Sequence, residues 1–350
     1  MRDNMSERKI VKCVVWDLDG TIWDGILLEN TVSKLKDNIL AIIQELDNRG
    51  ILQSIASKNE YCSAIQQLKK FNIDQYFLYP QIGWGPKSDS ILKIAESINI
   101  HIDSIAFIDD QEFELEEVSF SHSEVLCLNA NCVNEILDMP EFWPSFITAD
   151  SKMRRKMYQD DILRKKEEEQ YKGAKESFLK TLQMELTLSP AIESDLQRVE
   201  ELTVRTHQLN STGQTYSYDE LKAMITSEHY LLYVAELEDK FGTYGKVGLM
   251  LIEKKPDMWI LKLLLTSCRV VSRGVGSVML TYLLQYAKSQ GVPLLAEFVP
   301  TDRNRMMYIA YKLAGFHECG QNGSAVLLRY SSNNVPSLPP YIKVVLPTVF

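Results

Sequence analysis

The chain has 350 residues, which is long enough for two domains with separate hydrophobic cores. Its composition, 45% hydrophobic and 24% charged, is ordinary for a globular protein, and no stretch is long and apolar enough to span a bilayer. The net charge of −9 argues against nucleic-acid binding, which usually needs a basic protein. The six cysteines lack metal-ligand spacing, and residues 1–9 lead into no signal-type segment, so we expect a cytoplasmic protein with free thiols.

The first predicted strand, residues 12–16, ends directly in acidic side chains. It is an apolar run rich in β-branched residues, as is typical of a buried parallel strand, and Asp17 and Asp19 follow it. A turn would explain Gly20 and Thr21, but it leaves Asp17 on the apolar line of the strand, where an unpaired charge is costly. Ligands of open α/β sheets bind at the carboxyl ends of the strands, and Mg²⁺ prefers oxygen ligands. The pair of acids therefore indicates a magnesium site.

The next predicted strand, residues 51–56, ends at Ser57 and leads into a helix over 61–71. The Ser57 hydroxyl and the amides at the helix entry can hold a phosphate oxygen. Asn59 is a good candidate for the helix N-cap, and both interpretations can hold at once. The other elements expected up to residue 128 are helices at 37–50 and 88–98, a short strand at 76–80, and strands at 104–108 and 122–128.

Two further strand ends carry charged residues. Lys87 lies at the mouth of a predicted helix, where a lysine is usually a solvated charge and is mildly disfavoured by the helix dipole. An anion between the lysine and the helix would explain its place. The strand at 104–108 ends in Asp109 and Asp110, which repeats the pattern of the first strand. Because such ends share one edge of a doubly wound sheet, we expect all these side chains to converge.

The ordered set Asp-x-Asp-Gly-Thr, Ser, Lys and Asp-Asp resembles the haloacid dehalogenase (HAD) superfamily of aspartyl-nucleophile phosphotransferases. The resemblance implies that Asp17 is the nucleophile and that Asp19 protonates the leaving alcohol and then activates water. Ser57 and Lys87 would neutralise the oxygens of the transferring phosphoryl group. The chain between these motifs is used up by one helix and one strand each time, so no large cap domain fits.

The same resemblance implies a cofactor and further contacts. Mg²⁺ would be bound by Asp17, the Asp19 carbonyl and Asp109, with Asp110 in support. Further substrate contacts in this half would come from Thr21, Lys58 and Asn59.

Residues 146–183 are expected to connect the two halves of the chain. The prolines at 140–144 end the first pattern of strands and helices. Charge runs at 154–156 and 165–169 predict an exposed helix over 151–172, and a solvated linker fits them better than a docking site. A short helix is expected at 177–183.

The second half mixes predicted strands, several of them antiparallel, with helices. The expected strands are 184–188, 230–237, 246–253, 259–266 and 294–299, and the expected helices are 191–206, 277–290 and 304–313. An Arg-Gly-x-Gly turn at 273–276 lies between a strand and a helix, where backbone amides face a possible anion. With the later Tyr-x-x-Tyr-Lys-Leu-Ala-Gly-Phe at 308–316, this order is similar to the GNAT acyltransferase fold. Val271 stands where that fold usually has Gln or Arg, so we expect a phosphopantetheine arm on a carrier protein rather than free coenzyme A.

The expected fold class is therefore α/β: a HAD-like doubly wound parallel sheet domain without a large cap, followed by a GNAT-like α+β domain. The expected domains are a HAD-like phosphatase (1–145), a helical connector (146–183), a GNAT-like acyltransferase (184–330) and an extended, proline-containing tail (331–350).

This combination resembles the FkbH-like family over about residues 10–330. The stretches that carry the resemblance are 16–25, 55–59, 107–110, 202–210 and 267–276. Members are glyceryltransferase/phosphatases of polyketide pathways. The resemblance implies that the glyceryl group of 1,3-bisphosphoglycerate is placed on an acyl carrier protein thiol, with loss of phosphate, for a hydroxymalonyl- or methoxymalonyl-type extender unit. Substrate contacts in the second half would come from His207, Arg269, Arg273, Gly274 and Gly276. No nucleic acid or membrane partner is expected.

Two residues of the second half leave alternatives open. Cys268 lies near Arg269 and Arg273 in sequence, and positive neighbours favour a thiolate, so it is a candidate for a transient glyceryl carrier. The alternative is a buried structural cysteine. His207 is a candidate base or a polar pocket residue. At the level of the whole chain, the alternatives are a phosphatase whose GNAT-like half only binds a carrier protein, and an inert scaffold, which the complete acid, Ser and Lys set disfavours.

Overall fold

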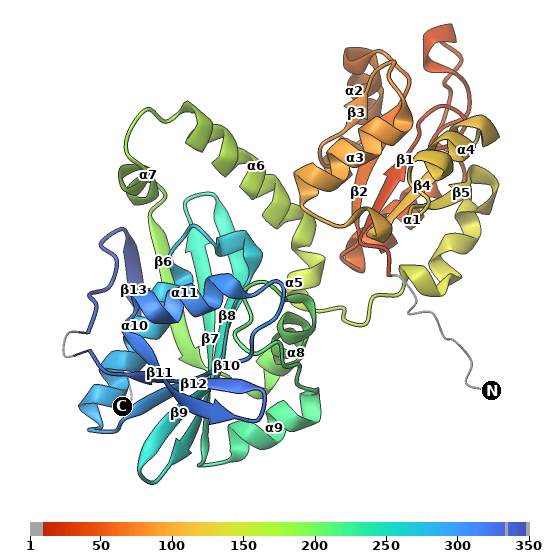
Figure 1. Ribbon diagram of the computed structural model, residues 1–350. Helices are drawn as coiled ribbons and strands as arrows, with labels where there is room; N and C mark the ends of the chain where they lie inside the picture. The colour runs from red at the N-terminus through yellow and green to blue at the C-terminus, as the bar shows by residue number, and fades with distance from the viewer. Residues whose placement is uncertain (1–9, 333–334, 348–350) are drawn as a thin grey trace, which may run out of the picture. The chain divides into compact units, whose positions relative to one another are not determined.

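The computed structural model describes residues 10–332 and 335–347 (Figure 1). The chain divides into two compact units, one up to Asp161 and the other from Ile162 onward. The division falls within the stretch 146–183 that was expected to connect the halves. Each unit has its own cluster of buried hydrophobic side chains.

A five-stranded parallel sheet forms the centre of the first unit, in the order β3-β2-β1-β4-β5. Its strands are β1 (Cys13–Trp16), β2 (Leu52–Ser57), β3 (Gln81–Ile82), β4 (Ile105–Asp109) and β5 (Leu126–Asn129). Its helices are α1 (Ile39–Asn48), α2 (Tyr61–Lys70), α3 (Lys87–Ile98), α4 (Glu112–Ser121) and α5 (Ala149–Lys152), with 3₁₀ turns at Leu27–Glu29, Asp74–Tyr76, Ile102–Ser104, Ala130–Asp138 and Pro140–Phe142. Strands β1, β2 and β4 are buried along their whole length, as expected for a parallel sheet covered on both faces.

The order of these strands fixes where a ligand can bind. The chain runs from β1 outward through β2 to β3, and then returns to the other side of β1 with β4 and β5. The direction of winding therefore reverses between β1 and β4, and open α/β sheets bind their ligands outside the carboxyl ends of the strands at such a point.

One predicted strand of this unit was misplaced. The strand expected at 76–80 is absent from that stretch, and the short strand β3 lies at Gln81–Ile82 instead. The physical reason is Tyr79, whose φ of 51° is left-handed and interrupts an extended run before Gln81. Helix α4 was not foreseen from the sequence.

Helix α6 (Arg154–Gln170), expected to be solvated, has buried charges. Arg155 pairs with Asp47 of the first unit through Nε at 2.8 Å. Arg164 is 1% exposed and donates through Nε and Nη2 to the two carboxylate oxygens of Asp239, at 2.7 and 2.9 Å, in the second unit. The expectation of a merely solvated helix was therefore wrong. A charge run read from sequence does not reveal its partners, because they lie far away in the chain.

The second unit contains an eight-stranded sheet in the order β11-β12-β10-β9-β8-β7-β6-β13. Its strands are β6 (Met184–Pro190), β7 (Tyr230–Asp239), β8 (Gly242–Lys255), β9 (Met258–Thr266), β10 (Leu294–Phe298), β11 (Phe316–Asn322), β12 (Ala325–Tyr330) and β13 (Ile342–Val345). Its helices are α7 (Lys175–Thr181), α8 (Leu196–Arg205), α9 (Tyr218–Thr226), α10 (Val275–Ser289) and α11 (Arg305–Leu313), with 3₁₀ turns at Glu193–Asp195 and Cys268–Val270. Neighbouring strands are antiparallel except for two parallel pairs, β9 with β10 and β6 with β13.

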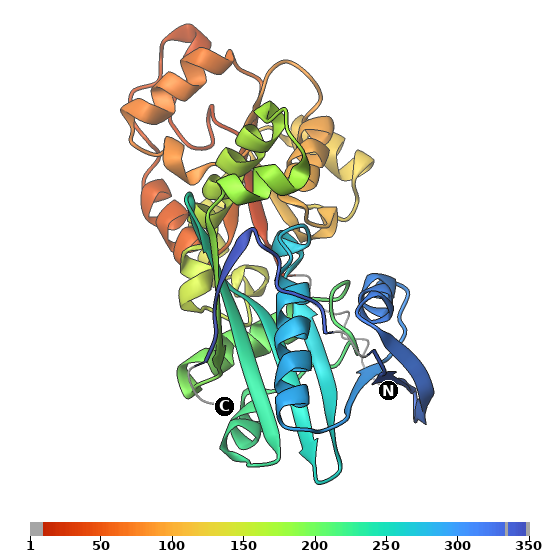
Figure 2. The ribbon, with the colours of Figure 1, turned by 90° about the vertical axis from the view of Figure 1, so that its left-hand side faces the viewer.

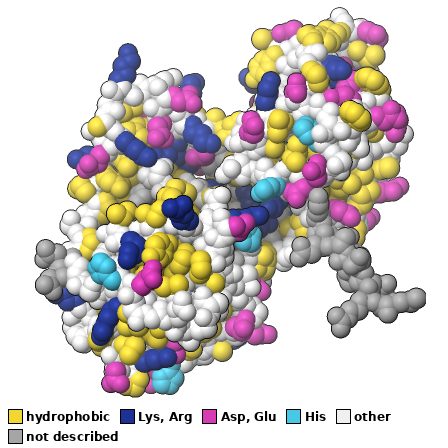
Figure 3. All heavy atoms as spheres, in the orientation of Figure 1, with side chains coloured by type: hydrophobic (Ala, Val, Ile, Leu, Met, Phe, Trp, Pro, Cys, Tyr) yellow, Lys and Arg dark blue, Asp and Glu magenta, His cyan; other side chains and the backbone are white. Residues whose placement is uncertain are grey.

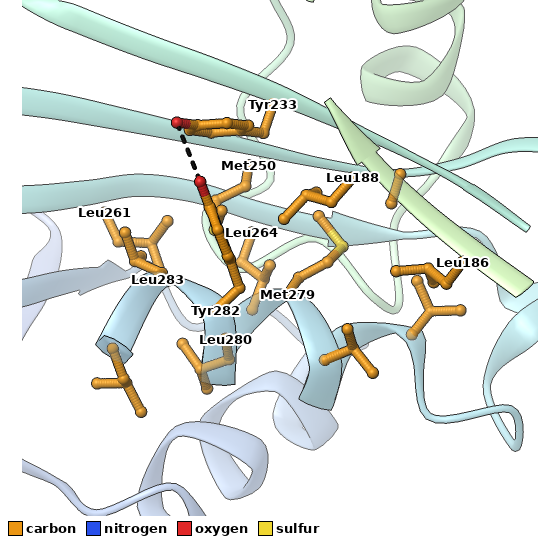
Figure 4. Close-up of a cluster of buried hydrophobic side chains, with 14 of the residues drawn as sticks. Leu186, Leu188, Tyr233, Met250, Leu261, Leu264, Met279, Leu280, Tyr282 and Leu283 are labelled. Carbon is orange, nitrogen blue, oxygen red and sulfur yellow. Dashed lines mark hydrogen bonds between the residues drawn. The ribbon is translucent and has the colours of Figure 1, made fainter. Parts of the chain in front are cut away.

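Helix α10 packs along one face of this sheet (Figure 2). Its side chains Met279, Tyr282 and Leu283 meet residues of the strands, and the Tyr282 hydroxyl is hydrogen-bonded to that of Tyr233 (Figure 4). Helices α8 and α9 build a second cluster with β7, β8 and β9.

The stretch 331–350 was expected to be an extended arm. It contributes β13, which pairs with β6 and so becomes part of the sheet; residues 333–334 and 348–350 lie outside the described part. On the face drawn in Figure 3, charged side chains of both signs are interspersed with hydrophobic ones. None of the helices in the described part of the chain combines the length and apolarity that a membrane span requires.

Candidate active site

The predicted strand ends of the first unit meet at the point where the sheet reverses direction. Lys87, the first residue of α3, donates from Nζ to Asp17 Oδ1 at 2.8 Å and to Asp109 Oδ2 at 2.5 Å. Asp17 directly follows β1, and Asp109 ends β4. The side chains of Lys87, Asp17 and Asp109 are 4%, 5% and 0% exposed. The lysine is therefore buried between two acids and is not the solvated charge of the alternative interpretation.

The arrangement of the acids fits a hard divalent cation. Asp17, Asp109 and Asp110 each offer one carboxylate oxygen, and these oxygens lie within 4.8 Å of one another. Three carboxylates face one lysine, so the cluster has an excess of negative charge where two of the acids are buried. Such burial is costly without further positive charge, and oxygen donors of this kind are the preferred ligands of Mg²⁺. Asp17, Asp109 and Asp110 are therefore the residues that would hold Mg²⁺.

The electrostatics of the cluster are visible in its pKa values. Burial, opposed by Lys87 and reinforced by Asp109, raises the pKa of Asp17 to about 7. Burial alone would lower the pKa of Lys87, but the carboxylates of Asp17 and Asp109 outweigh it and raise this pKa overall. Burial and the neighbouring Asp109 also raise the pKa of Asp110. In the absence of a metal ion, Asp17 thus holds a proton more readily than an ordinary aspartate.

We expect the metal-free protein to become less stable as the pH rises from about 4 to about 7. The pKa of folded Asp17, about 7, lies above its ordinary value of 3.8, so folding takes up a proton in this window and the free energy of unfolding falls as pH increases. The full shift corresponds to a loss on the order of 4 kcal/mol. Urea unfolding in EDTA at about pH 4 and about pH 8 measures it. Equal stability at both pH values, or the same pH dependence in Asp17→Asn, would contradict this prediction.

Ser57 lies at the end of β2, is 3% exposed, and forms a hydrogen bond with Asp17 that lowers the pKa of Asp17. The N-cap of α2 is Glu60, whose carboxylate accepts from the amides of Cys62 and Ser63. The interpretation of Asn59 as the cap was therefore wrong, because the acidic side chain one residue later reaches the free amides.

Three further residues of this half, Lys58, Thr21 and Asn59, were predicted to contact the substrate, and their surroundings differ. Lys58 forms an ion pair with Glu114, with Nζ 2.5 Å from Oε1. The ion pairs in the described part of the chain do not join it to Asp17, Asp109 or Asp110. Thr21 is fully buried, and its hydroxyl has no hydrogen-bond partner among the described residues. The oxygen Oδ1 of Asn59 is likewise buried and unpaired, although its amide nitrogen is engaged.

Sequence reasoning missed Trp23. Its indole Nε1 donates to Asp19 Oδ1 at 2.7 Å, and the ring is fully buried. The signal that could have found it is general: a buried tryptophan needs an acceptor for its N–H, and an acid four residues earlier is the nearest candidate in sequence.

Both the backbone conformation at position 20 and the nearby Asp110 favour glycine there. Its φ is +67°, and a Cβ built on it would lie 2.8 Å from Asp110 Cγ. We expect Gly20→Ala to reduce the free energy of unfolding by about 2 kcal/mol, because a left-handed backbone is costly for a residue with a Cβ and the Asp110 carboxylate must also move aside. Gly83→Ala is the matched control, since nothing lies within 4 Å of its added Cβ. Urea unfolding of both variants tests this prediction. An equal loss of unfolding free energy in Gly20→Ala and Gly83→Ala would show that position 20 does not specifically require glycine.

In the second unit, the predicted phosphate cradle, residues 273–276, is partly covered by other residues of the chain. Arg273 is 5% exposed, and its Nη2 lies 3.4 Å from Glu168 Oε2. Gly274 has φ +84° and begins α10 as its N-cap, but a Cβ on it would lie 2.8 Å from the hydroxyl of Tyr341. Gly276 follows in the first turn of α10. Tyr341 of the C-terminal stretch therefore lies against Gly274, and Arg273 is paired through Nη2 while its buried Nη1 has no hydrogen-bond partner among the described residues.

The opening between β9 and β10 is also occupied. These parallel strands pair over only three positions and then separate. Beyond that point, residues 209–211 (the bridging segment) lie between them: Ser211 N donates to Leu264 O at 3.0 Å, and Val299 N donates to Ser211 O at 3.1 Å. Asn304 is fully buried and fixes the segment by donating from Nδ2 to the Asn210 carbonyl at 3.0 Å. The chain thus supplies the edge hydrogen bonds that an extended ligand would otherwise make there.

The remaining predicted residues of this unit lie at its surface. Cys268 is exposed at the start of the 3₁₀ turn after β9, which excludes the alternative of a buried structural cysteine. Arg269 follows it and is partly exposed, and its amide hydrogen-bonds to Ser267 Oγ. His207 is exposed in the loop after α8.

Among known proteins, the chain is similar to parts of several solved structures. No family model matches the chain. No curated protein matches it significantly. The chain is similar to the N-terminal part of the protein BF1531 from Bacteroides fragilis, which contains a phosphatase domain complexed with Mg, with 25% identity, a TM-score of 0.35 and coverage of 39% of this chain and 41% of that one. The chain therefore spans well under half of that relative.

Two acetyltransferase structures are also similar to part of the chain. The ribosomal-protein-S18-alanine N-acetyltransferase from Escherichia coli is 17% identical, with a TM-score of 0.34, over 43% of this chain and 96% of that one. The PaiA N-acetyltransferase from Thermoplasma acidophilum, in complex with coenzyme A, is 13% identical, with a TM-score of 0.35, over 42% and 99%. The predicted fold class is confirmed by the sheets themselves: a doubly wound parallel sheet without a large cap, followed by an α+β unit.

Proposed function

We propose that the chain is a Mg²⁺-dependent phosphatase and glyceryltransferase that converts 1,3-bisphosphoglycerate into a glyceryl thioester on an acyl carrier protein. The phosphatase part rests on one observation: buried Lys87 bridges Asp17 and Asp109 at the point where the sheet reverses direction. A purely structural ion pair would need neither the third acid, Asp110, beside it nor this position in the fold.

Phosphoryl transfer would proceed in two steps, each with a role for Asp17 and Asp19. In the first, a carboxylate oxygen of Asp17 attacks phosphorus, the bond from phosphorus to the leaving oxygen breaks, and Asp19 gives that oxygen a proton. In the second, a water oxygen attacks phosphorus, its proton passes to Asp19, and the bond to Asp17 breaks, which returns the carboxylate and releases inorganic phosphate. Lys87 and Ser57 stabilise the charge on the phosphoryl oxygens. Mg²⁺, when bound, supplies further positive charge to those oxygens.

Two features support an acyl phosphate and a carrier protein as partners. Each connection between the site motifs holds one α-helix with 3₁₀ turns and loops or a short strand, so the first unit has no large cap of its own to exclude a bulky substrate. Cys268 is exposed in the second unit, as a thiol that accepts a glyceryl group must be. At that thiol, the thiolate sulfur would attack the acyl carbon of 1,3-bisphosphoglycerate, the carboxyl-bound phosphate would leave, and the thiolate of the carrier would then displace Cys268. Hydrolysis of the remaining 3-phosphate ester at the Asp17 site would give the glyceryl group.

A second candidate function is favoured by a specific observation. The bridging segment fills the opening between β9 and β10, Tyr341 lies against Gly274 of the predicted phosphate cradle, and Glu168 pairs with its Arg273. These contacts favour a phosphatase whose second unit only binds a carrier protein and performs no acyl transfer.

One experiment separates the two candidates. The full chain is incubated with 1,3-bisphosphoglycerate, Mg²⁺ and candidate carrier proteins, and intact masses of both proteins are measured. The first candidate predicts a glyceryl adduct on the carrier and, transiently, on Cys268, with no enzyme adduct in Cys268→Ala. The second predicts Mg²⁺-dependent phosphate release from the 3-phosphate ester of 1,3-bisphosphoglycerate, or of the 3-phosphoglycerate that its hydrolysis leaves, without any glyceryl adduct on the carrier. Absence of Mg²⁺-dependent phosphate release would reject both.

A further inference from the structure

The carboxylate of Asp19 is held at both of its oxygens by groups that sequence motifs do not assign to it. On Oδ1 it accepts from the indole Nε1 of Trp23 at 2.7 Å and from the amide of Leu27 at 3.1 Å. On Oδ2 it accepts from Asn59 Nδ2 at 3.0 Å. Three donors from two different loops leave this carboxylate little freedom to rotate.

Asn59 connects Asp19 to the rest of the site. Its Nδ2 also donates to Ser57 Oγ at 3.2 Å, and Ser57 in turn is hydrogen-bonded to Asp17. The orientation of the amide is fixed by chemistry, because an ionised carboxylate accepts hydrogen bonds only and must face the NH₂ group. One buried side chain therefore links the acid, the serine and the nucleophile.

Trp23 is itself firmly placed. Its ring is fully buried, with its centroid 6.2 Å from that of Phe71, and its amide donates to the carbonyl of Leu18 at 3.3 Å. It also forms isolated β-bridges with Asp19 and Leu35. The indole N–H thus reaches Asp19 from a rigid position.

We propose that Trp23 and Asn59 are positioning residues that aim the Asp19 carboxylate at the leaving oxygen and at the attacking water. This inference rests on the proposed phosphatase function. Losing one of these hydrogen bonds leaves Asp17, Lys87 and the acids of the metal site in place, but it lets the Asp19 carboxylate rotate away from the reacting oxygens.

The first variant is Trp23→Phe, which keeps a buried aromatic ring but removes the N–H together with part of the indole volume. Trp16→Phe is the matched control: Trp16 is also fully buried, and its Nε1 donates to Gln53 Oε1 at 3.1 Å. With full-length protein, Mg²⁺ and 3-phosphoglycerate, we expect Trp23→Phe to lower kcat about 10- to 30-fold with KM changed less than about 2-fold. The control should stay within about 2-fold of the parent.

Two further measurements distinguish a role of Trp23 in positioning Asp19 from a general disturbance of the fold. p-Nitrophenyl phosphate needs no proton on its leaving oxygen, so Trp23→Phe should release nitrophenolate in a burst of about one equivalent per enzyme, followed by slow hydrolysis of the phosphoenzyme. In the Asp19→Ala background, adding Trp23→Phe should cost less than about 2-fold more, because the group that it positions is already gone. Asn59→Ala provides the same tests from the other side of Asp19, should Trp23→Phe fail to fold.

The outcomes distinguish this inference from the proposed function. If Asp17→Asn retains full activity, the phosphatase assignment itself is wrong. If Asp17→Asn is inactive but both positioning variants behave like Trp16→Phe, or their losses add to that of Asp19→Ala, the positioning role is wrong. Loss of kcat with a burst and without additivity supports it.

Discussion

Asp17→Asn is expected to lower the phosphatase activity of the chain by at least about 10⁴-fold, measured as Mg²⁺-dependent phosphate release. The amide is nearly isosteric with the carboxylate, but it is a poor nucleophile and a weaker ligand for a hard cation. The loss should fall on kcat, since Lys87 and Ser57 still bind the phosphoryl oxygens. The control is Asp89→Asn, the same change at an exposed position in the first turn of α3, which should leave activity within about 2-fold.

The same substitution is expected to stabilise the metal-free protein at neutral pH. The pKa of Asp17 is raised to about 7 by burial, so its charged form is disfavoured in the folded state and a neutral amide avoids that cost. Activity and stability should therefore move in opposite directions, as is common where a buried charge is retained for function. An Asp17→Asn variant that is both inactive and less stable in EDTA would mean that the loss of activity reflects a damaged fold.

The convergence of the phosphatase site could be predicted because the geometry of a parallel sheet does most of the positioning. Once Asp17, Ser57 and Asp109 are recognised at the carboxyl ends of buried strands, the sheet places them at one edge whatever the loops do. Lys87 could be added because it begins a helix that faces the same edge. What sequence left open was the partner of each group, since Asn59 caps nothing and holds Asp19 instead.

In the second unit the prediction of elements was better than the prediction of contacts. Strand and helix patterns are local, so β9, α10 and β10 were found close to their true bounds. The contact of Tyr341 with the cradle and the pairing of Arg273 with Glu168 join residues far apart in sequence. No pattern of spacing encodes such contacts, and a glycine-rich turn looks the same in sequence whether it is open or covered.

Lys87→Met is expected to reduce the free energy of unfolding of the metal-free protein by about 3–5 kcal/mol at neutral pH. The substitution keeps the length of the buried side chain but leaves Asp17 and Asp109 without their common counter-charge. The pKa of Lys87 is raised in the folded state, so titration of the lysine itself removes stability only above its ordinary value of 10.5, and any change of its contribution at lower pH comes from Asp17. Lys34→Met is the control, because its pair with Asp37 is 60% and 88% exposed and its loss should leave the free energy of unfolding almost unchanged.

Magnesium should distinguish this loss from ordinary core damage. If the acids hold the cation, Mg²⁺ can replace part of the missing positive charge, so the rise in Tm on adding Mg²⁺ should be larger in Lys87→Met than in the parent chain. Lowering the pH should also stabilise Lys87→Met relative to the parent chain, because protonation of Asp17 removes one of the uncompensated charges. A Lys87→Met protein that is destabilised equally at about pH 5 and about pH 8, and that gains no more from Mg²⁺ than the parent, would show that the lysine stabilises the fold by packing and not by balancing the acids.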